Sequence, residues 1–71
     1  SYDHVESIKK LKESGVYATL TDDLRLVANL RTENPDMSLR EIGELCSPPL
    51  SRSAVNYRLK RLMEIAQKTE N

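Results

Sequence analysis

The chain has 71 residues, 31% of them charged, and its eleven basic and eleven acidic side chains give a formal net charge of zero. This length allows one small domain, which buries only about 60% of the surface that its unfolded chain exposes. A single cysteine excludes an internal disulfide, and no apolar run approaches the roughly 20 residues of a membrane-spanning helix. Because the chain begins with Ser, we expect it to be a piece of a protein that extends further towards its N-terminus.

The charges are not spread evenly along the chain. Residues 1–50 carry six basic and nine acidic side chains, a balance of −3, whereas residues 51–71 carry five basic and two acidic side chains, a balance of +3. Within SPPLSRSAVNYRLKRLM, residues 47–63, there are four basic residues and no acid. Such asymmetry is more informative about partners than the net charge.

The apolar pattern predicts helices throughout, and the first covers about residues 2–14. Its apolar side chains recur at helical spacing, at Val5, Ile8 and Leu11. Gly15 follows directly and can take the left-handed conformation that ends many helices. We expect residues 16–20 to form a short connector.

A second helix is predicted over residues 22–33. Thr21 is a candidate N-cap, and Asp22 and Asp23 place negative charge in the first turn, where the helix dipole favours it. The helix should end before Asn34-Pro35, because the residue before a proline is driven out of the helical region. Its apolar face comprises Leu24, Val27 and Ala28, with Leu30 beside it.

The third predicted helix, residues 39–46, begins at an S-x-x-E capping box formed by Ser38 and Glu41. Ser47, Pro48 and Pro49 end this helix, because neither proline can donate a backbone hydrogen bond. Its apolar face comprises Leu39, Ile42, Leu45 and Cys46. Gly43 weakens the helix by about 1 kcal/mol relative to alanine, and the close approach of another helix explains its presence better than a ligand contact does.

Ser51 is predicted to cap a fourth helix over residues 52–67. At about 100° per residue one stripe of this helix is apolar and belongs to the core; it comprises Val55, Leu59, Leu62 and Ala66. The opposite side is polar, with Ser53, Asn56, Tyr57, Lys60, Arg61 and Glu64. The polar tail after Ala66 is expected to fray.

A short capped helix, a tight turn and a longer helix with a basic outer face are typical of a helix-turn-helix. The second helix of that motif enters the major groove of DNA with its N-terminal residues on base edges. Arg suits guanine, Asn suits adenine and Ser suits several bases, so Arg52, Ser53 and Asn56 are the candidate base-reading residues. Cations further along supply affinity through phosphates. The candidate phosphate contacts are Ser51, Tyr57, Lys60, Arg61 and Arg58.

Some residues allow two interpretations. Arg58 lies at the edge of the apolar stripe, so it either contacts phosphate or forms a structural ion pair, for example with Glu41 or Glu44. Leu50 is expected to fill the core between the two helices. Cys46 behaves as a small hydrophobic residue on an apolar face. With one Cys and one His far apart in sequence, the chain offers no ligand set for a metal.

The segment from Leu24 to Leu62 resembles the C-terminal helix-turn-helix domain of the WhiA family of sporulation and cell-division regulators. In that family hP-x-x-S-L-x-E-L-G (h for apolar) leads into PPhS-K/R-S-x-V-N-H/Y-R-L-x-R-L. The matching residues are Pro35, Ser38, Leu39, Glu41, Ile42, Gly43, Pro48, Pro49, Leu50, Ser51, Arg52, Ser53, Val55, Asn56, Tyr57, Arg58, Leu59, Arg61 and Leu62. Several members carry His at the position of Tyr57.

The resemblance implies an all-α fold, a small bundle of four helices similar to region 4 of sigma factors, with residues 1–71 as one DNA-binding domain. It implies sequence-specific binding of promoter DNA by the helix over residues 52–67, within a bacterial regulator of sporulation, cell division or chromosome segregation. Further implied partners are an N-terminal LAGLIDADG-like domain of the parent chain and RNA polymerase or a co-regulator. The implied location is the cytoplasm, in association with the nucleoid, and not a membrane.

Two alternatives to DNA binding remain open at the level of sequence. Acidic residues on the first three helices suit a module that docks RNA polymerase or another regulator, and a helical cap that only stabilises its parent has the same composition. The sequence offers no nucleophile–base pair, no glycine-rich phosphate loop and no carboxylate pair at catalytic spacing. We therefore predict neither enzymatic activity nor a cofactor.

Overall fold

A computed structural model describes residues 3–70, without the side chain of Glu70. It contains α1 (His4–Ser14), a short 3-10 helix over Val16–Thr19, α2 (Asp22–Glu33), α3 (Leu39–Leu45) and α4 (Arg52–Glu70). No strand occurs within residues 3–70. The predicted all-α class and the small bundle of four helices are therefore confirmed.

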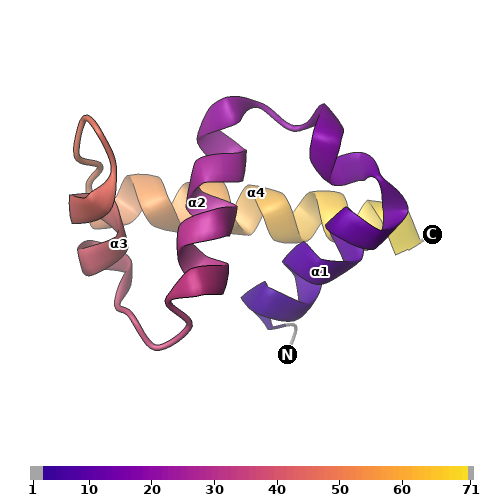
Figure 1. Cartoon of the computed structure of the whole chain (residues 1–71), viewed down its shortest axis with the longest axis horizontal. Helices are drawn as coiled ribbons and strands as arrows, with labels where there is room; N and C mark the ends of the chain where they lie inside the picture. The colour runs from indigo at the N-terminus through magenta and orange to yellow at the C-terminus, as the bar shows by residue number, and fades with distance from the viewer. Residues whose placement is uncertain (1–2, 71) are drawn as a thin grey trace.

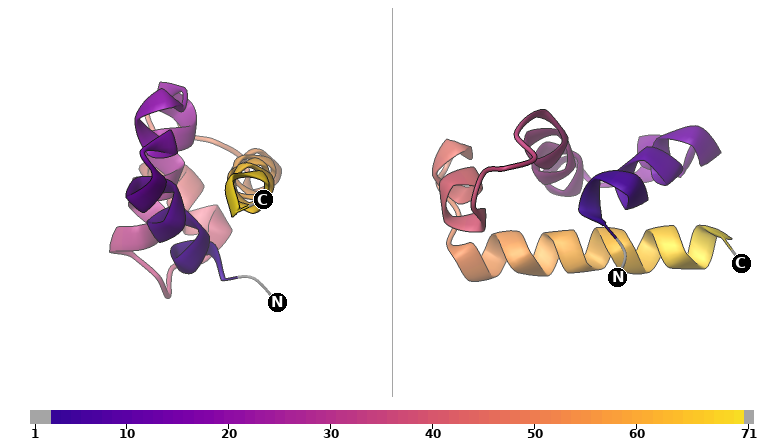
Figure 2. Two further views of the ribbon diagram at one scale, coloured as in Figure 1. Left: turned by 90° about the vertical axis from the view of Figure 1, so that its right-hand side faces the viewer. Right: turned by 90° about the horizontal axis from the view of Figure 1, so that it is seen from below.

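Helix α4 is the long axis of the molecule, and the other helices pack along one side of it. Its 19 residues span about 28 Å at 1.5 Å per residue, most of the 33 Å length of the whole domain. Helix α3 lies at the N-terminal end of α4, α2 crosses its middle, and α1 covers its C-terminal half (Figures 1 and 2). Among the residues that the structure describes, no other helix packs on the opposite side of α4, which carries the polar face (Figure 2).

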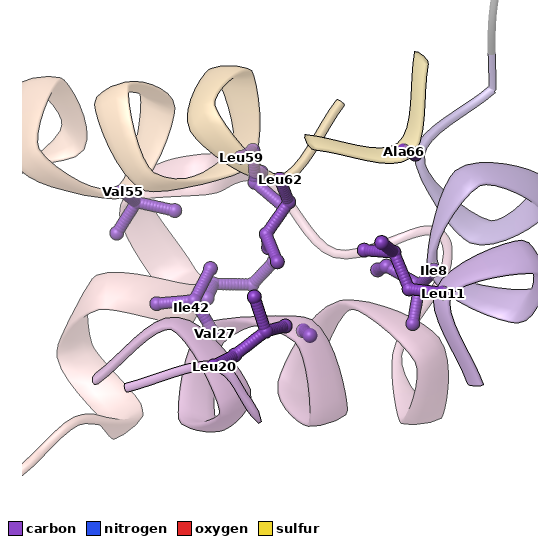
Figure 3. Close-up of a cluster of buried hydrophobic side chains, with 10 residues drawn as sticks. Ile8, Leu11, Leu20, Val27, Ile42, Val55, Leu59, Leu62 and Ala66 are labelled. Atoms are coloured by element: carbon purple, nitrogen blue, oxygen red, sulfur yellow. The ribbon is translucent and has the colours of Figure 1, made fainter. Parts of the chain in front are cut away.

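The core forms where these helices converge on α4 (Figure 3). The predicted apolar stripe of α4 is confirmed, because all four of its residues are buried. They meet Ile42 of α3, Val27 of α2, and Ile8 and Leu11 of α1. Leu20, which follows the 3-10 helix, also belongs to this core. Burial of these aliphatic side chains fixes which side of α4 faces outward.

The first helix begins and ends at identifiable caps. The Asp3 carboxylate accepts a hydrogen bond from the Val5 backbone N–H (3.4 Å), so the observed helix starts at His4. The predicted start at Tyr2 lies outside the described residues. The predicted stop is confirmed: Gly15 has φ +85°, and its N–H donates to the Lys12 carbonyl. The predicted connector begins with a 3-10 turn because Thr19 and Leu20 hydrogen-bond back to Val16 and Tyr17.

Helix α2 has the predicted bounds and the predicted N-cap residue, Thr21. Thr21 has the extended backbone of a cap, yet its side chain makes no capping hydrogen bond. Of the predicted apolar face, Val27 and Ala28 are fully buried, whereas Leu24 and Leu30 are partly buried against the core. The helix therefore presents its first turn, with Asp22 and Asp23, to solvent.

Helix α3 confirms the capping box and corrects one part of the predicted apolar face. The Ser38 hydroxyl accepts from the Glu41 N–H (3.2 Å), and the Glu41 carboxylate accepts from the Ser38 N–H (3.0 Å). Ile42 and Cys46 are buried, but Leu45 is 54% exposed. At about 100° per residue Leu45 lies at the edge of this face, about 100° from Cys46, and the packing leaves it on the outer side.

Helix α4 continues to Glu70, beyond the predicted end at about Gln67. The hydroxyl of Thr69 donates to the Ile65 carbonyl (2.8 Å), and Ala66 is fully buried in the core next to α1. Packing thus extends the helix into a polar tail that its composition alone would leave frayed. No helix among residues 3–70 is long and apolar enough to cross a membrane.

Candidate nucleic-acid interface

The turn between α3 and α4 sets the angle at which α4 leaves the bundle. The Leu50 N–H donates to the Gly43 carbonyl (2.9 Å), which ties the end of the turn back to α3. The Leu50 side chain packs against the core, as predicted. The close approach at Gly43 is therefore made chiefly by the backbone of the turn and only secondarily by a helix, through the Val55 side chain.

Ser51 caps α4 as predicted. Its Oγ accepts a hydrogen bond from the Ala54 N–H (3.2 Å), and its carbonyl accepts from the Val55 N–H (3.1 Å). A serine hydroxyl that accepts a capping bond keeps its own hydrogen for donation. Ser51 is exposed, so this donor can reach an acceptor outside the domain.

The three candidate base-reading residues lie together on the first two turns of α4. Arg52, Ser53 and Asn56 are exposed and line one shallow depression of about 200 Å³. No residue in the described part of the chain forms a hydrogen bond or ion pair with these side chains, so their polar groups are available to a partner outside the domain. Long or polar side chains in this state at the start of a helix are the arrangement that reads base edges.

The candidate phosphate contacts are distributed further along α4. Tyr57 is 68% exposed, and Lys60 is also exposed. Arg61 Nη1 lies 3.7 Å from Glu64 Oε1, an ion pair between half-exposed groups. Such pairs contribute about 0–1 kcal/mol, so a phosphate can replace the carboxylate at small cost.

Arg58 forms a structural ion pair, but with a different partner from those considered in the sequence. Its Nε lies 3.5 Å from Asp23 Oδ2 of α2, and its Nη1 donates to the Ala54 carbonyl (3.3 Å). Glu41 and Glu44 are not its partners: Glu41 completes the capping box, and Glu44 pairs with Arg40 (3.6 Å). The side chain as a whole is 23% exposed, although its Nε atom is buried.

A pocket of about 380 Å³ lies between the first turn of α2 and the outer side of α4. Helix α4 contributes Tyr57, Arg58 and Arg61, three of the five candidate phosphate contacts. The N-terminal end of α2 contributes Thr21, Asp23 and Leu24, none of which the sequence indicated as part of a binding site. Lys60 and Ser51 do not line this pocket.

Asp23 carries a stabilised negative charge at the edge of this pocket. A hydrogen bond from the Thr21 side chain is the main cause that lowers the pKa of its carboxyl, and the backbone N–H groups of Asp23 and Leu24 and the charge of Arg58 lower it further. The carboxylate is therefore ionised at neutral pH. Arg58 is the weakest of these influences.

The described residues offer no metal site and no exposed thiol. No group of three or more His, Cys, Asp or Glu side chains within residues 3–69 could hold a metal ion. Cys46 is buried as predicted, and its thiol donates to the Ile42 carbonyl (3.5 Å). The polar face of α4 and the adjoining pocket are therefore the best-developed site.

Comparison with known proteins identifies the kind of domain. The family model described as the WhiA C-terminal HTH domain matches residues 1–66. A probable cell division protein WhiA of Symbiobacterium thermophilum is 44% identical over 93% of this chain and 21% of its own length. The protein of the same name from Desulforudis audaxviator is 57% identical over 69% of the chain and 16% of its own length. No solved structure is significantly similar. The chain spans about a fifth of the length of these relatives.

Proposed function

The chain belongs to the WhiA C-terminal helix-turn-helix family, and we propose that it binds specific sequences of double-stranded promoter DNA with α4 in the major groove. In this proposal it acts within a bacterial transcription regulator of sporulation, cell division or chromosome segregation, at the nucleoid in the cytoplasm. The relatives carry the name of a probable cell division protein, and the aligned part of this chain covers 21% of the length of the Symbiobacterium protein. Their length leaves room for a further domain such as the LAGLIDADG-like domain implied by the resemblance.

The observation that supports the proposal is a cluster of exposed polar side chains at the start of α4 that have no hydrogen-bond or ion-pair partner among the described residues. Arg52, Ser53 and Asn56 are exposed, share one depression, and have no partner among residues 3–69. Arg can bond the O6 and N7 atoms of guanine, and Asn the N6 and N7 atoms of adenine. A stabilising role would not require these side chains to stay free.

The phosphate contacts are proposed to flank this cluster. The polar face of α4 has two flanks. At about 100° per residue, Arg52 and Asn56 lie on one flank, and Tyr57, Arg58 and Arg61 lie on the other. A helix in the major groove has a phosphate backbone on each side, so one set can read bases while the other holds a strand. Ser51 and Lys60 complete the proposed set.

Selection of duplexes from a random pool tests this function. The chain is expected to enrich a defined sequence and to bind it with a log–log salt slope of roughly −0.9 for each phosphate neutralised. Recovery of random duplexes only would contradict sequence-specific recognition. Absence of any salt-dependent duplex binding would contradict the function as a whole.

A second candidate function is docking of a protein such as RNA polymerase or another regulator. It is favoured by two exposed leucines outside the α4 face, Leu26 (41%) and Leu45 (54%), and by the excess of acidic residues before residue 51. Capture of purified RNA polymerase that persists when Lys60 and Arg61 are replaced by Ala but is lost in Leu45→Ser would support this role. The two functions can coexist because they use different surfaces.

A further inference from the structure

The pocket between α2 and α4 has the chemistry of an anion site that is partly occupied by the protein itself. Two arginines and Tyr57 line it, and the side chains of these residue types bond phosphate oxygens. The N-terminal end of α2 lies at the same pocket and attracts negative charge through its dipole. The acidic exception in this lining is Asp23.

Arg58 is held in this pocket, but not all of its hydrogen-bond donors have an acceptor. Its Nη1 donates to the Ala54 carbonyl, but its Nε is buried and has no hydrogen-bond partner, although it lies within ion-pair distance of Asp23. A buried donor without a partner is costly. The guanidinium would therefore gain from an acceptor that enters the pocket.

Asp23 occupies the position that such an acceptor would take. Its carboxylate lies at the first turn of α2 and 3.5 Å from the arginine, yet its side chain is 58% exposed. Exposed ion pairs are weak, and this one lacks an aligned hydrogen bond. Arg58 therefore loses little free energy when a phosphate replaces the carboxylate as its partner. The negative charge of Asp23 nevertheless repels the phosphate.

We infer that this pocket is a subsite for one backbone phosphate of DNA, and that Asp23 competes with that phosphate for Arg58. The inference rests on the proposed function and deepens it, because it identifies an acidic residue of α2 as a determinant of affinity. Asp23 lowers the affinity for a duplex of any sequence, since the contact it opposes carries no base information. Removal of its charge leaves Arg58 free for the phosphate.

Asp23→Asn tests the inference, with Asp22→Asn as a matched control. Both changes remove one negative charge from the first turn of α2, but Asp22 pairs with Arg25 and does not line the pocket. Fluorescence anisotropy with a labelled duplex of random sequence is expected to give roughly threefold to tenfold tighter binding for Asp23→Asn at low salt. Its log–log salt slope should become steeper by about 0.9, and Asp22→Asn should leave the slope unchanged.

Arg58→Gln provides the second half of a double-mutant cycle. The gain from Asp23→Asn should disappear when Arg58 is already Gln, because the two residues act on the same phosphate. Urea denaturation of each variant separates a change in folding from a change in binding. If Asp23→Asn is not folded at the assay temperature, Asp23→Ser takes its place in the same cycle, because serine is a favourable residue at the start of a helix.

Nuclear magnetic resonance distinguishes a DNA phosphate from free phosphate. The amide signals of Leu24 and Arg58 should shift on addition of the duplex, and not on addition of inorganic phosphate at matched ionic strength. Salt-dependent duplex binding with Asp23→Asn equal to Asp22→Asn would overturn the subsite while the proposed function stands. Absence of duplex binding by the parent chain and both variants would overturn both.

Discussion

The backbone of Leu50 lies directly against Gly43. The Leu50 N–H donates to the Gly43 carbonyl (2.9 Å), and a Cβ atom at position 43 would overlap the Leu50 carbonyl oxygen. Gly43 lies inside α3, where an alanine would otherwise be more favourable by about 1 kcal/mol. The glycine is thus required by the turn that directs α4, and not by the conformation of its own helix.

Gly43→Ala should destabilise the domain. The overlap is with backbone, which cannot move aside as a flexible side chain can, so overpacking should cost about 1–3 kcal/mol despite the better helix propensity of alanine. Urea denaturation measures the change in the free energy of unfolding. Glu44→Ala, at the next, exposed position of the same helix, should stay within about 0.5 kcal/mol of the parent. Equal stability of the parent and both variants would show that the turn has room for a methyl group.

Much of this fold is predictable because its signals are local. The capping box of Ser38 and Glu41, the stop at Gly15 and the apolar stripe of α4 each depend on residues within a few positions of one another. Leu45 was predicted incorrectly, because helical spacing gives a face but not the extent to which neighbours cover it. The end of α4 was also missed, because packing of α1 supports it.

Mild acid should weaken the domain through protonation of His4. Burial lowers the pKa of His4 most, the charge of Arg31 lowers it further, and Asp3 opposes both. Because the folded pKa lies below the unfolded value of 6.5, the unfolded chain binds more protons between these two values. Stability is therefore expected to fall as pH falls through 6.5, and to level off below the folded pKa.

Thermal denaturation of the parent and His4→Gln at pH 7.5 and pH 5.5 measures this effect. The melting temperature of the parent should drop over this interval, whereas that of His4→Gln should change less. A parent whose melting temperature is the same at the two pH values, or a variant with the same drop, would exclude His4 as the cause.

Lys60→Ala should weaken binding to duplexes of every sequence by a similar factor. Lys60 is exposed on the outer face of α4, and a phosphate contact gives affinity without base information. The log–log salt slope should become shallower by about 0.9. Lys68→Ala removes the same charge near the far end of α4 and should leave the slope unchanged. A loss confined to one selected sequence would instead assign Lys60 to base reading.

The site is less predictable from sequence than the fold. The outward position of Arg52, Ser53 and Asn56 follows from the apolar stripe of α4, so the sequence alone indicates which side chains are available. The pairing of Arg58 with Asp23 joins residues far apart in the chain, and it depends on how α2 crosses α4. No local pattern encodes that crossing, and for this reason the sequence indicated Glu41 or Glu44 instead.

The central claim is that the start of α4 reads bases, and titration of Asn56→Ala tests it most directly. Fluorescence anisotropy would compare a duplex selected by the parent chain with a random duplex. The account predicts a loss of about 1–3 kcal/mol on the selected duplex, about 5- to 150-fold in Kd, and no change on the random one. Gln67→Ala, an exposed amide further along the same helix, should bind both as the parent does. An Asn56→Ala chain that binds the selected duplex as tightly as the parent would contradict the assignment.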